Sequence, residues 1–339
     1  MVLLKNIIGR SAVSLTSHVK GPSPACSCFL YRNVETTQHI TSRTSSRLVE
    51  VGKLQVPKLQ GKYESGQLFL HEIFGYRGVI LFPWVAKVYD RDDTKALSYP
   101  SGRHGKDVVG KTHTYYQTLM DSRDSADINT QTESVTFLGS PDSGEKLCSI
   151  PGLDYVSHEN IVPYMTSDQN PIQNDLFEKF FIYDKDSDPA WIAEDTLRSW
   201  QRLNHPWLEL SEVHRQTTNN IRVTVTPFYM GNREAHSSRV YWWRYIVRIE
   251  NLGKETVQLR ERHWRIFSLS GTLETVRGRG VVGKEPVLSS QQPAFQYSSV
   301  LSLQAPSGHM WGVFKMEKED GSTFECKIPP CSLESKVDE

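Results

Sequence analysis

Apolar and polar residues alternate over short stretches in both halves of the chain, and this period of two predicts β-strands. The alternation is clearest at residues 222–226 and 245–250. Clusters of β-branched and aromatic residues between turn residues predict further strands, at 78–82, 113–120, 134–138, 256–259, 264–269, 294–297, 312–316 and 324–328. About eight short strands beyond residue 221, with no helix between them, predict an antiparallel sandwich.

The segment between the two strand-rich halves has helical periodicity instead. Its apolar residues recur at spacings of four, four and three, which predicts one buried helical face: Ile172, Leu176, Phe180 and Tyr183. Asp188 followed by Pro189 then predicts the start of a second helix, as an N-cap with proline at the first helical position. We expect this helix to bury Trp191, Leu197 and Trp200 and to end near residue 203, ahead of Pro206.

Charge is unevenly distributed along the 339 residues, although the formal net charge is zero. Residues 1–49 contain one acid, Glu35, against six basic residues: Lys5, Arg10, Lys20, Arg32, Arg43 and Arg47. The rest of the chain is therefore mildly acidic, which argues against dominant nonspecific nucleic-acid binding but leaves room for a local basic patch.

The basic leader, residues 1–50, has the composition of a mitochondrial transit peptide. A short amphipathic helix would place Leu4, Ile8 and Leu15 near one face, with Lys5 and Arg10 away from it. We therefore expect import into the mitochondrial matrix. The alternative is a disordered basic tail without a targeting role.

The cysteines indicate a reducing compartment and predict no metal site. Three lie outside the leader, an odd number, in the set Cys26, Cys28, Cys148, Cys326 and Cys331. Cys326 and Cys331 could pair or bind a metal, but two ligands do not complete a tetrahedral zinc site. We interpret them as buried thiols and expect no cofactor. The apolar runs, such as residues 79–82, are far shorter than the ~20 residues of a membrane helix.

Residues 278–283 read Gly-Arg-Gly-Val-Val-Gly and fit the G-x-G-x-x-G dinucleotide motif. That motif requires a strand before it and a long helix after it, and Pro286 with its strand-like neighbours does not favour such a helix. We therefore predict that Gly278, Gly280 and Gly283 serve a tight connection between strands. The functional alternative is an anion-binding nest of backbone N–H groups with three basic neighbours, Arg277, Arg279 and Lys284.

Arginines also cluster just before this run. Arg260 and Arg262 are two residues apart, so on a regular strand they share one face and could contact phosphates or acidic partner residues. Interleaved acids such as Glu261, Glu274 and Glu285 make mutual pairing equally open. No catalytic motif accompanies them: the His158-Glu159 pair lacks the second histidine of H-E-x-x-H, and no G-x-S-x-G is present.

Residues 173–181 nearly match a motif that binds the replicative sliding clamp. The expected aromatic pair, Phe180 and Phe181, arrives one residue late, which rotates the side chains by ~100° on a helix. The simpler interpretation is an amphipathic helix that buries Leu176 and Phe180. If the segment instead binds the sliding clamp, Phe180 and Phe181 are the candidate partner contacts.

Two stretches resemble known modules. Residues 66–71 (Gly-Gln-Leu-Phe-Leu-His), 74–80 (Phe-Gly-Tyr-Arg-Gly-Val-Ile), 115–119 (Tyr-Tyr-Gln-Thr-Leu) and 155–160 (Tyr-Val-Ser-His-Glu-Asn) resemble the YccV-like family, described as hemimethylated-DNA-binding. Residues 249–253, 257–259, 262–264, 278–283, 286, 295–299, 308–312 and 328–330 resemble the ApaG domain. The chain departs from these patterns by long loops in the first module and by Cys331 in place of an aromatic residue in the second.

The resemblance implies a mainly β protein: an SH3-like small β-barrel with a short helical segment, then an immunoglobulin-like antiparallel β-sandwich. We place the barrel at 51–170, a helical connector at 171–210 and the ApaG domain at 211–335. The combination further implies a non-enzymatic adaptor of the mitochondrial matrix and the nucleus. The implied partners are DNA polymerase delta through its small subunit, the sliding clamp, a primase-polymerase, and mitochondrial ClpX, whose ClpXP protease it would regulate. The alternative functions are DNA binding through the YccV-like module and a phosphate-handling enzyme built on the glycine run.

Overall fold

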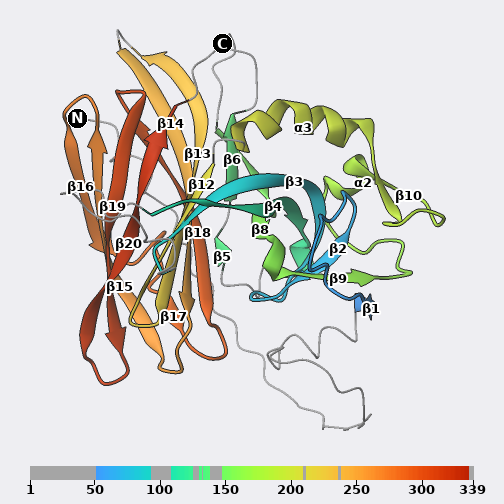
Figure 1. The fold of residues 1–339 in the computed structure, drawn as a ribbon, viewed down its shortest axis with the longest axis horizontal. Coiled ribbons are helices and arrows are strands. Elements are labelled where there is room, and N and C mark those ends of the chain that lie inside the picture. Colours follow the sequence, from blue (N-terminus) through green and yellow to red (C-terminus); the bar gives the residue numbers. More distant parts are fainter. Residues whose placement is uncertain are drawn as a thin grey trace, which may run out of the picture. The chain divides into compact units, whose positions relative to one another are not determined.

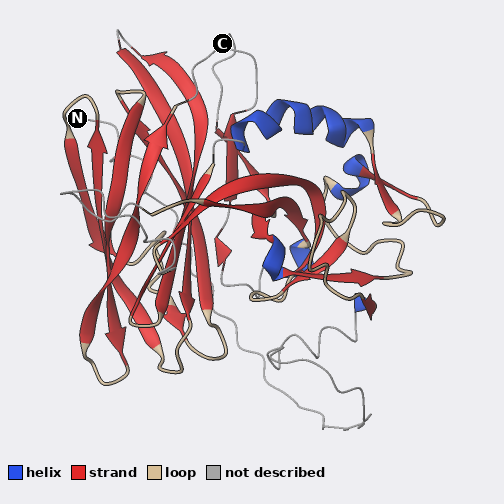
Figure 2. Ribbon diagram, viewed as in Figure 1, coloured by secondary structure: helices blue, strands red, loops and turns tan. Residues whose placement is uncertain are grey.

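The computed structural model describes residues 51–92, 108–124, 130–131, 133–137, 147–208, 211–235 and 238–335. The leader, with Cys26 and Cys28, lies outside these residues. The described chain is mainly β, as predicted (Figure 2). None of its helices has the length and apolar character needed to cross a bilayer.

The first module is a curled antiparallel sheet in the order β9-β2-β3-β4-β8. Its strands are β2 (Leu68–His71), β3 (Arg77–Asp90), β4 (Lys111–Met120), β8 (Leu153–Ser157) and β9 (Ile161–Met165), with β1 (Lys53–Leu54) on the outer edge of β9. This part of the chain also contains η2 (Ser122–Asp124), β5 (Thr130–Gln131), β6 (Glu133–Phe137), β7 (Leu147–Pro151) and η3 (His158–Asn160). β6 and β7 pair with each other as a separate two-stranded sheet. The expected small barrel is thus an open one, because no ladder joins β8 to β9 in the described part of the chain.

Strand β3 is apolar along residues 78–82 because both of its faces are covered. Val79 and Leu81 contribute to one buried cluster, and Ile80 contributes to another on the opposite side of the sheet. The first cluster continues under the connector, which includes α2 (Phe177–Phe180) and α3 (Asp195–Leu208).

The connector differs from its predicted helices. The helix expected from Ile172 through Tyr183 shrinks to α2, after which β10 (Phe181–Tyr183) pairs with β11 (Trp191–Ala193) as a separate two-stranded hairpin. The register opposes Phe181 with Ala193 and Tyr183 with Trp191, so strand alternation buries Phe181 and Trp191 together.

The second predicted helix begins later and ends later than expected. Asp188 and Pro189 belong to the hairpin loop rather than to a helix N-terminus, and α3 begins at Asp195. It continues past Pro206 to Leu208, because a proline in the last turn removes only one backbone hydrogen bond.

The second module is the predicted antiparallel sandwich, with two facing layers (Figure 1). One layer contains β12 (Glu212–Thr218), β13 (Ile221–Ala235), β14 (Ser238–Asn251) and β18 (Ala294–Leu303). The other contains β15 (Val257–Ser268), β16 (Leu273–Arg279), β17 (Val287–Leu288), β19 (Ser307–Lys318) and β20 (Thr323–Glu334). The strands are longer than expected, and the two segments predicted at 256–259 and 264–269 form one strand, β15, with a register shift between Leu259 and Glu261.

The two modules share one sheet, which the sequence did not predict. The strand β12 of the sandwich pairs in parallel with the end of β3, opposing Val213 with Val88 and His214 with Tyr89. Within the described residues, eleven strands therefore form one sheet, in the order β1-β9-β2-β3-β12-β13-β14-β18-β5 with β4 and β8 branching from β3. All of these strands belong to one compact unit.

A buried carboxylate on β8 also connects the two modules. Asp154 on β8 is 1% exposed; it accepts hydrogen bonds from Tyr76 Oη at 2.6 Å and, across the interface, from Gln296 Nε2 on β18 at 2.8 Å. The backbone N–H of Tyr155 donates to the same carboxylate at 2.8 Å. Because several donors compensate its desolvation, the buried carboxylate contributes to the joint rather than weakening it.

A buried arginine that stacks on aromatic rings forms a second part of the joint. Arg244 on β14 is buried; its guanidinium lies 5.0 Å from the ring centre of Tyr155 and 4.9 Å from that of Phe228. It also donates a hydrogen bond to Tyr155 Oη at 2.8 Å. Trp84 of β3 packs edge-on to Phe228 at 6.3 Å, so the barrel and sandwich share one core.

A buried histidine lies at the same joint. His71 Nδ1 accepts hydrogen bonds from the backbone N–H groups of Ile73 and Phe74 at 3.1 and 3.2 Å. Arg248 of the sandwich lies 5.4 Å from the Phe74 ring centre. Burial and, secondarily, this arginine lower the pKa of His71 well below its ordinary value, so His71 is neutral at pH 7.

We predict that acidification below about pH 6.5 destabilises the fold through His71. The folded pKa lies below the unfolded value, so the contribution is complete above about pH 6.5 and decreases by up to ~1.4 kcal/mol per pH unit as the unfolded chain takes up the proton. His71→Asn keeps an acceptor for both N–H groups and removes the titration. Urea unfolding at pH 7.5 and 5.5 should show that wild type loses about 1–1.5 kcal/mol more than this variant. Equal losses would contradict the assignment.

Candidate interaction surfaces

The glycine run forms a tight hairpin turn, as predicted, and opens no helix. β16 ends at Arg279, and the Val281 N–H donates to Lys284 O at 2.8 Å while the Lys284 N–H donates back to Val281 O at 2.9 Å. Between them Val282 and Gly283 have φ values of 43° and 78°. Two positive φ values in a two-residue loop identify a type I′ turn, and the short strand β17 follows it.

The three glycines of the run differ in what a side chain at each position would contact. A Cβ on Gly280, whose φ is 57°, would lie 2.1 Å from Lys284 O, whereas a Cβ on Gly283 would meet nothing within 4 Å. A Cβ on Gly278 would press on the guanidinium of Arg262 at 3.1 Å. Gly280 is therefore required by close packing, and Gly283 only by its backbone conformation.

The candidate anion nest is largely occupied by the protein itself. The N–H groups of Gly280, Val281 and Lys284 all donate to backbone carbonyls. The carbonyls of Arg279 and Gly280 accept hydrogen bonds from Arg262 Nη1 at 3.0 and 2.7 Å. This geometry favours a structural role for the run. The role of Arg277 and Lys284 in anion binding stays a prediction.

Arg260 and Arg279 pair with neighbouring carboxylates. Arg260 lies 2.8 Å from Glu317 and 3.0 Å from Glu285, and Arg279 lies 2.8 Å from Glu285. Hydrogen bonds from Arg260 lower the pKa of Glu285 and that of Glu317, so both acids are charged at neutral pH. Arg260 and Arg279 therefore pair with acids of the same chain, which is the second of the two interpretations left open by the sequence.

A β-bulge separates the arginines that we expected on one face. Leu259 opposes Met316, and after the shift Arg262 opposes Phe314, so Arg262 lies on the core side of the sheet. Arg260, at the bulge, instead reaches Glu317 on the outer face. The prediction that Arg260 and Arg262 share one face was wrong, because the alternation of side chains along a strand is interrupted where a bulge inserts a residue.

The edge strand β16 is the most exposed strand of the sandwich. It pairs only with β15 in the described residues, and six of its seven residues are exposed. Leu273 and Val276 are 57% and 38% exposed, and Arg277 donates to His263 Nε2 at 3.2 Å. An unpaired edge with apolar and arginine side chains is a surface onto which a partner strand can add.

The clamp-motif residues are not on a surface. Phe180 and Phe181 are 4% and 3% exposed, and Phe180 packs on Trp200 at 5.6 Å. In this fold neither ring can reach a partner unless the connector opens.

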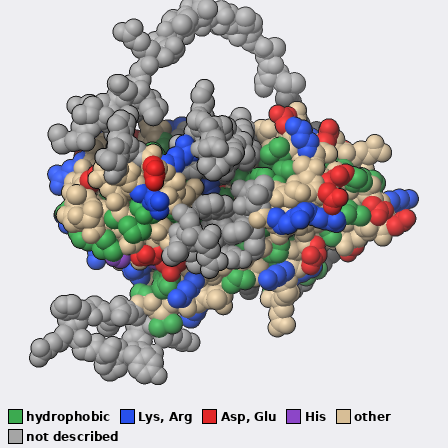
Figure 3. Space-filling model, turned by 90° about the horizontal axis from the view of Figure 1, so that it is seen from above, with side chains coloured by type: hydrophobic (Ala, Val, Ile, Leu, Met, Phe, Trp, Pro, Cys, Tyr) green, Lys and Arg blue, Asp and Glu red, His purple; other side chains and the backbone are tan. Residues whose placement is uncertain are grey.

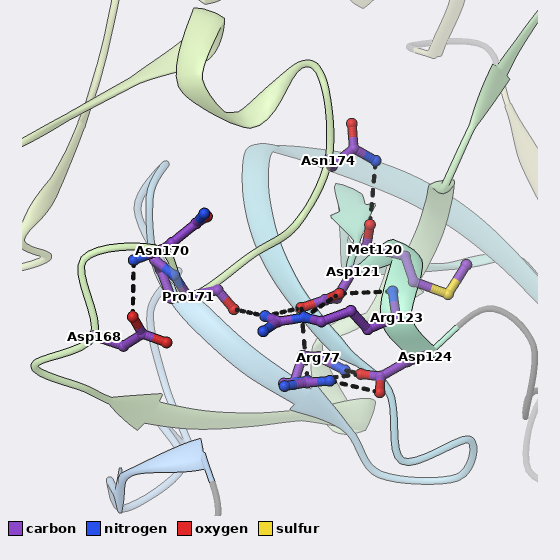
Figure 4. A network of polar contacts seen from close by, with 9 residues as sticks. All are labelled: Arg77, Met120, Asp121, Arg123, Asp124, Asp168, Asn170, Pro171 and Asn174. Atoms are coloured by element: carbon purple, nitrogen blue, oxygen red, sulfur yellow. Dashed lines mark hydrogen bonds and ion pairs between the residues drawn. The ribbon is translucent and has the colours of Figure 1, made fainter.

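Two arginines of the first module, Arg77 and Arg123, are held by buried carboxylates (Figure 4). Arg77 donates to both oxygens of Asp124 at 2.9 Å, and Arg123 donates to Asp121. Arg123 also donates to Pro171 O at 3.0 Å, and Asn174 donates to Met120 O at 3.3 Å. The network neutralises both arginines and fastens the start of the connector to the barrel.

No group of metal-ligand side chains gathers in the described part of the chain. Cys326 and Cys331 are free and buried, as predicted, and burial raises the pKa of Cys326 to about 12 and raises the pKa of Cys331 further. Neither thiol is therefore a nucleophile at neutral pH.

These features define a class of protein in which two β modules share a sheet and present an exposed strand edge. Two family models match the two modules. The model of the family described as "Hemimethylated DNA-binding protein YccV like" matches residues 61–188, and that of the ApaG domain matches residues 231–318.

Full-length relatives extend the similarity across both modules. The chain is 63% identical to polymerase delta-interacting protein 2 of Mus musculus over 90% of this chain and 85% of that protein. It is 60% identical to the Homo sapiens protein of the same name, over 96% and 92%. The ApaG protein of Rhodopseudomonas palustris (strain TIE-1) is 46% identical over 36% of this chain and 94% of its own length. The chain belongs to the polymerase delta-interacting protein 2 family.

Two structural features were not predicted from the sequence. One is the joint around Asp154 and Arg244, whose residues come from strands far apart in the chain and leave no local signal. The other is the β10–β11 hairpin. Its two short apolar stretches flank an Asp- and Pro-containing loop, which is a hairpin signal that the helical spacing obscured.

We predict that Gly280→Ala destabilises the sandwich more than Gly283→Ala does. Both alanines would occupy a left-handed backbone conformation, which costs about 1–2 kcal/mol. Only the alanine at 280 would also collide with a carbonyl oxygen, so it should cost at least about 1 kcal/mol more. Urea unfolding of the two variants measures the difference, and equal costs would show that the close approach at 280 is relieved by the loop.

Proposed function

We propose that this chain is a non-enzymatic adaptor that connects proteins of DNA replication and damage tolerance and regulates the mitochondrial ClpXP protease. The observation that carries the proposal is identity of 60–63% across both modules with two proteins named for interaction with polymerase delta. We further propose DNA polymerase delta, the sliding clamp, a primase-polymerase and ClpX as its partners. We place the protein in the mitochondrial matrix and the nucleus.

The sandwich offers the geometry for such docking. The outer edge of β16 is free in the described residues, so an extended partner segment can add a strand there through main-chain hydrogen bonds. Leu273 and Val276 would supply apolar contact, and Arg277 would supply charge. The pairing of Arg260 with Glu285 and Glu317 holds the neighbouring strands in place.

The second candidate function is DNA binding through the first module, because its family carries the description of hemimethylated-DNA binding. The pairing of Arg77 with Asp124 and of Arg123 with Asp121 counts against it. Charge already neutralised inside the protein releases no counterions from DNA.

We predict that the full-length chain forms a stoichiometric complex with at least one of the four purified partners, measured by isothermal titration calorimetry. Val276→Asp with Arg277→Glu should weaken that complex about tenfold or more, because a buried carboxylate and a reversed charge oppose docking at β16. Lys327→Glu, an exposed change on β20 of the same sheet, is the matched control.

Two outcomes would contradict the adaptor proposal: no complex with any of the four partners, or sustained nucleotide hydrolysis that co-purifies with the chain. A complex that tolerates the β16 changes would contradict β16 as the docking surface. Affinity for DNA that decreases steeply with salt would transfer the function to the second candidate. Fractionation of cells that express the tagged full chain tests the two compartments.

A further inference from the structure

The β10–β11 hairpin has an apolar outer face. Ile182 and Ile192 lie directly opposite each other and are 56% and 38% exposed. The other face of the hairpin buries Phe181 and Trp191. Strand alternation normally places polar residues on such an outer face, so a pair of exposed isoleucines is informative.

This face is the floor of a surface groove. The groove has a volume of about 470 Å³ and continues to the first turn of α3. Apolar side chains from both hairpin strands and charged side chains around them line it: Ile182, Ile192 and Ala193, with Asp184, Glu194, Asp195 and Arg198.

The rim of the groove is negatively charged. Its single cation, Arg198, already lies 3.2 Å from Asp195, and the Glu194 carboxylate forms no ion pair within the described chain. Residues 182–198 contain five acids against two basic residues. Charged and apolar side chains are interspersed on the right-hand side of the molecule, over α3 and the connector (Figure 3).

The groove is preformed. Hydrogen bonds from the Asp184 N–H to Ala190 O at 2.7 Å and from the Glu194 N–H to Phe180 O at 2.8 Å hold the two ends of the hairpin. Trp191 packs on Phe177 at 4.8 Å beneath it. A ligand therefore meets an ordered surface and loses little free energy in ordering it.

We infer that this groove is a docking site for a short segment of a partner protein, one that carries aliphatic side chains between lysines or arginines. The aliphatic groups match the isoleucine floor, and the basic groups match the carboxylate rim. The same rim repels nucleic acid and anionic membranes, whose surfaces are phosphates. The inference extends the adaptor function by a second surface, on a different module from the β16 edge.

Synthetic peptides test this inference on the full-length protein. The probe is a panel of twelve-residue fluorescent peptides with two aliphatic residues at alternating central positions and lysine or arginine on both sides. A second panel carries glutamate in place of every basic residue. Fluorescence anisotropy should detect saturable binding within the first panel and none within the second.

Variants locate the site. Ile182→Thr with Ile192→Thr keeps β-branched residues in the hairpin and should weaken binding about tenfold, with the melting temperature unchanged. Glu194→Gln with Asp195→Asn should weaken it several-fold and reduce its salt dependence. Val287→Thr, an exposed aliphatic change on β17 of the sandwich, is the control and should leave binding intact.

Several results would overturn the inference: no binding by any basic peptide, equal binding by both panels, or binding that the isoleucine variant retains. Self-association that the isoleucine changes abolish, measured by analytical ultracentrifugation, would assign the groove to a second copy of the chain and also overturn it. The β16 variant separates this test from the adaptor test, because it should lose the replication or protease partner and still bind the peptide.

Discussion

The structure depends on the pairing of β3 with β12. One edge of β3 pairs with β2 at Arg77–Val79 and, farther along, with β12 at Lys87–Asp90, so a strand of the barrel continues directly into the sandwich sheet. Two side-chain hydrogen bonds cross the joint, from Gln296 to Asp154 and from Arg244 to Tyr155. Opening the joint would expose Phe228 and Trp84 and leave buried polar groups without partners, so separating the two modules costs free energy.

The interlocked joint is compatible with the adaptor function that we propose. The exposed β16 edge lies on the sandwich, and the hairpin groove lies on the connector, which Arg123 and Asn174 fasten to the barrel. Both surfaces are therefore attached to the same framework. Partners bound at β16 and at the groove would be held on one framework without any loop having to order first.

The sequence predicted local features well and tertiary ones poorly. Alternation and turn residues located the sandwich strands, and Pro286 after the glycine run correctly argued for a hairpin rather than a cofactor-binding helix. The prediction of a long helix in the connector was wrong because residues 180–183 fit both helical spacing and strand alternation. Only the pairing of this segment with the strand that contains Trp191 decides between helix and strand. The bulge at Arg260 and the β3–β12 pairing could not be predicted, since both depend on contacts between distant segments.

Hydrogen exchange in the Asp154→Ala variant tests the joint most directly. This change leaves Tyr76 and Gln296 without their acceptor and should cost about 2–5 kcal/mol. If the modules unfold as one unit, the slowest-exchanging amides of β3 and β4 and those of β13 and β14 should lose protection by the same free energy. Loss confined to the barrel strands, with β13 and β14 as protected as in wild type, would contradict the account.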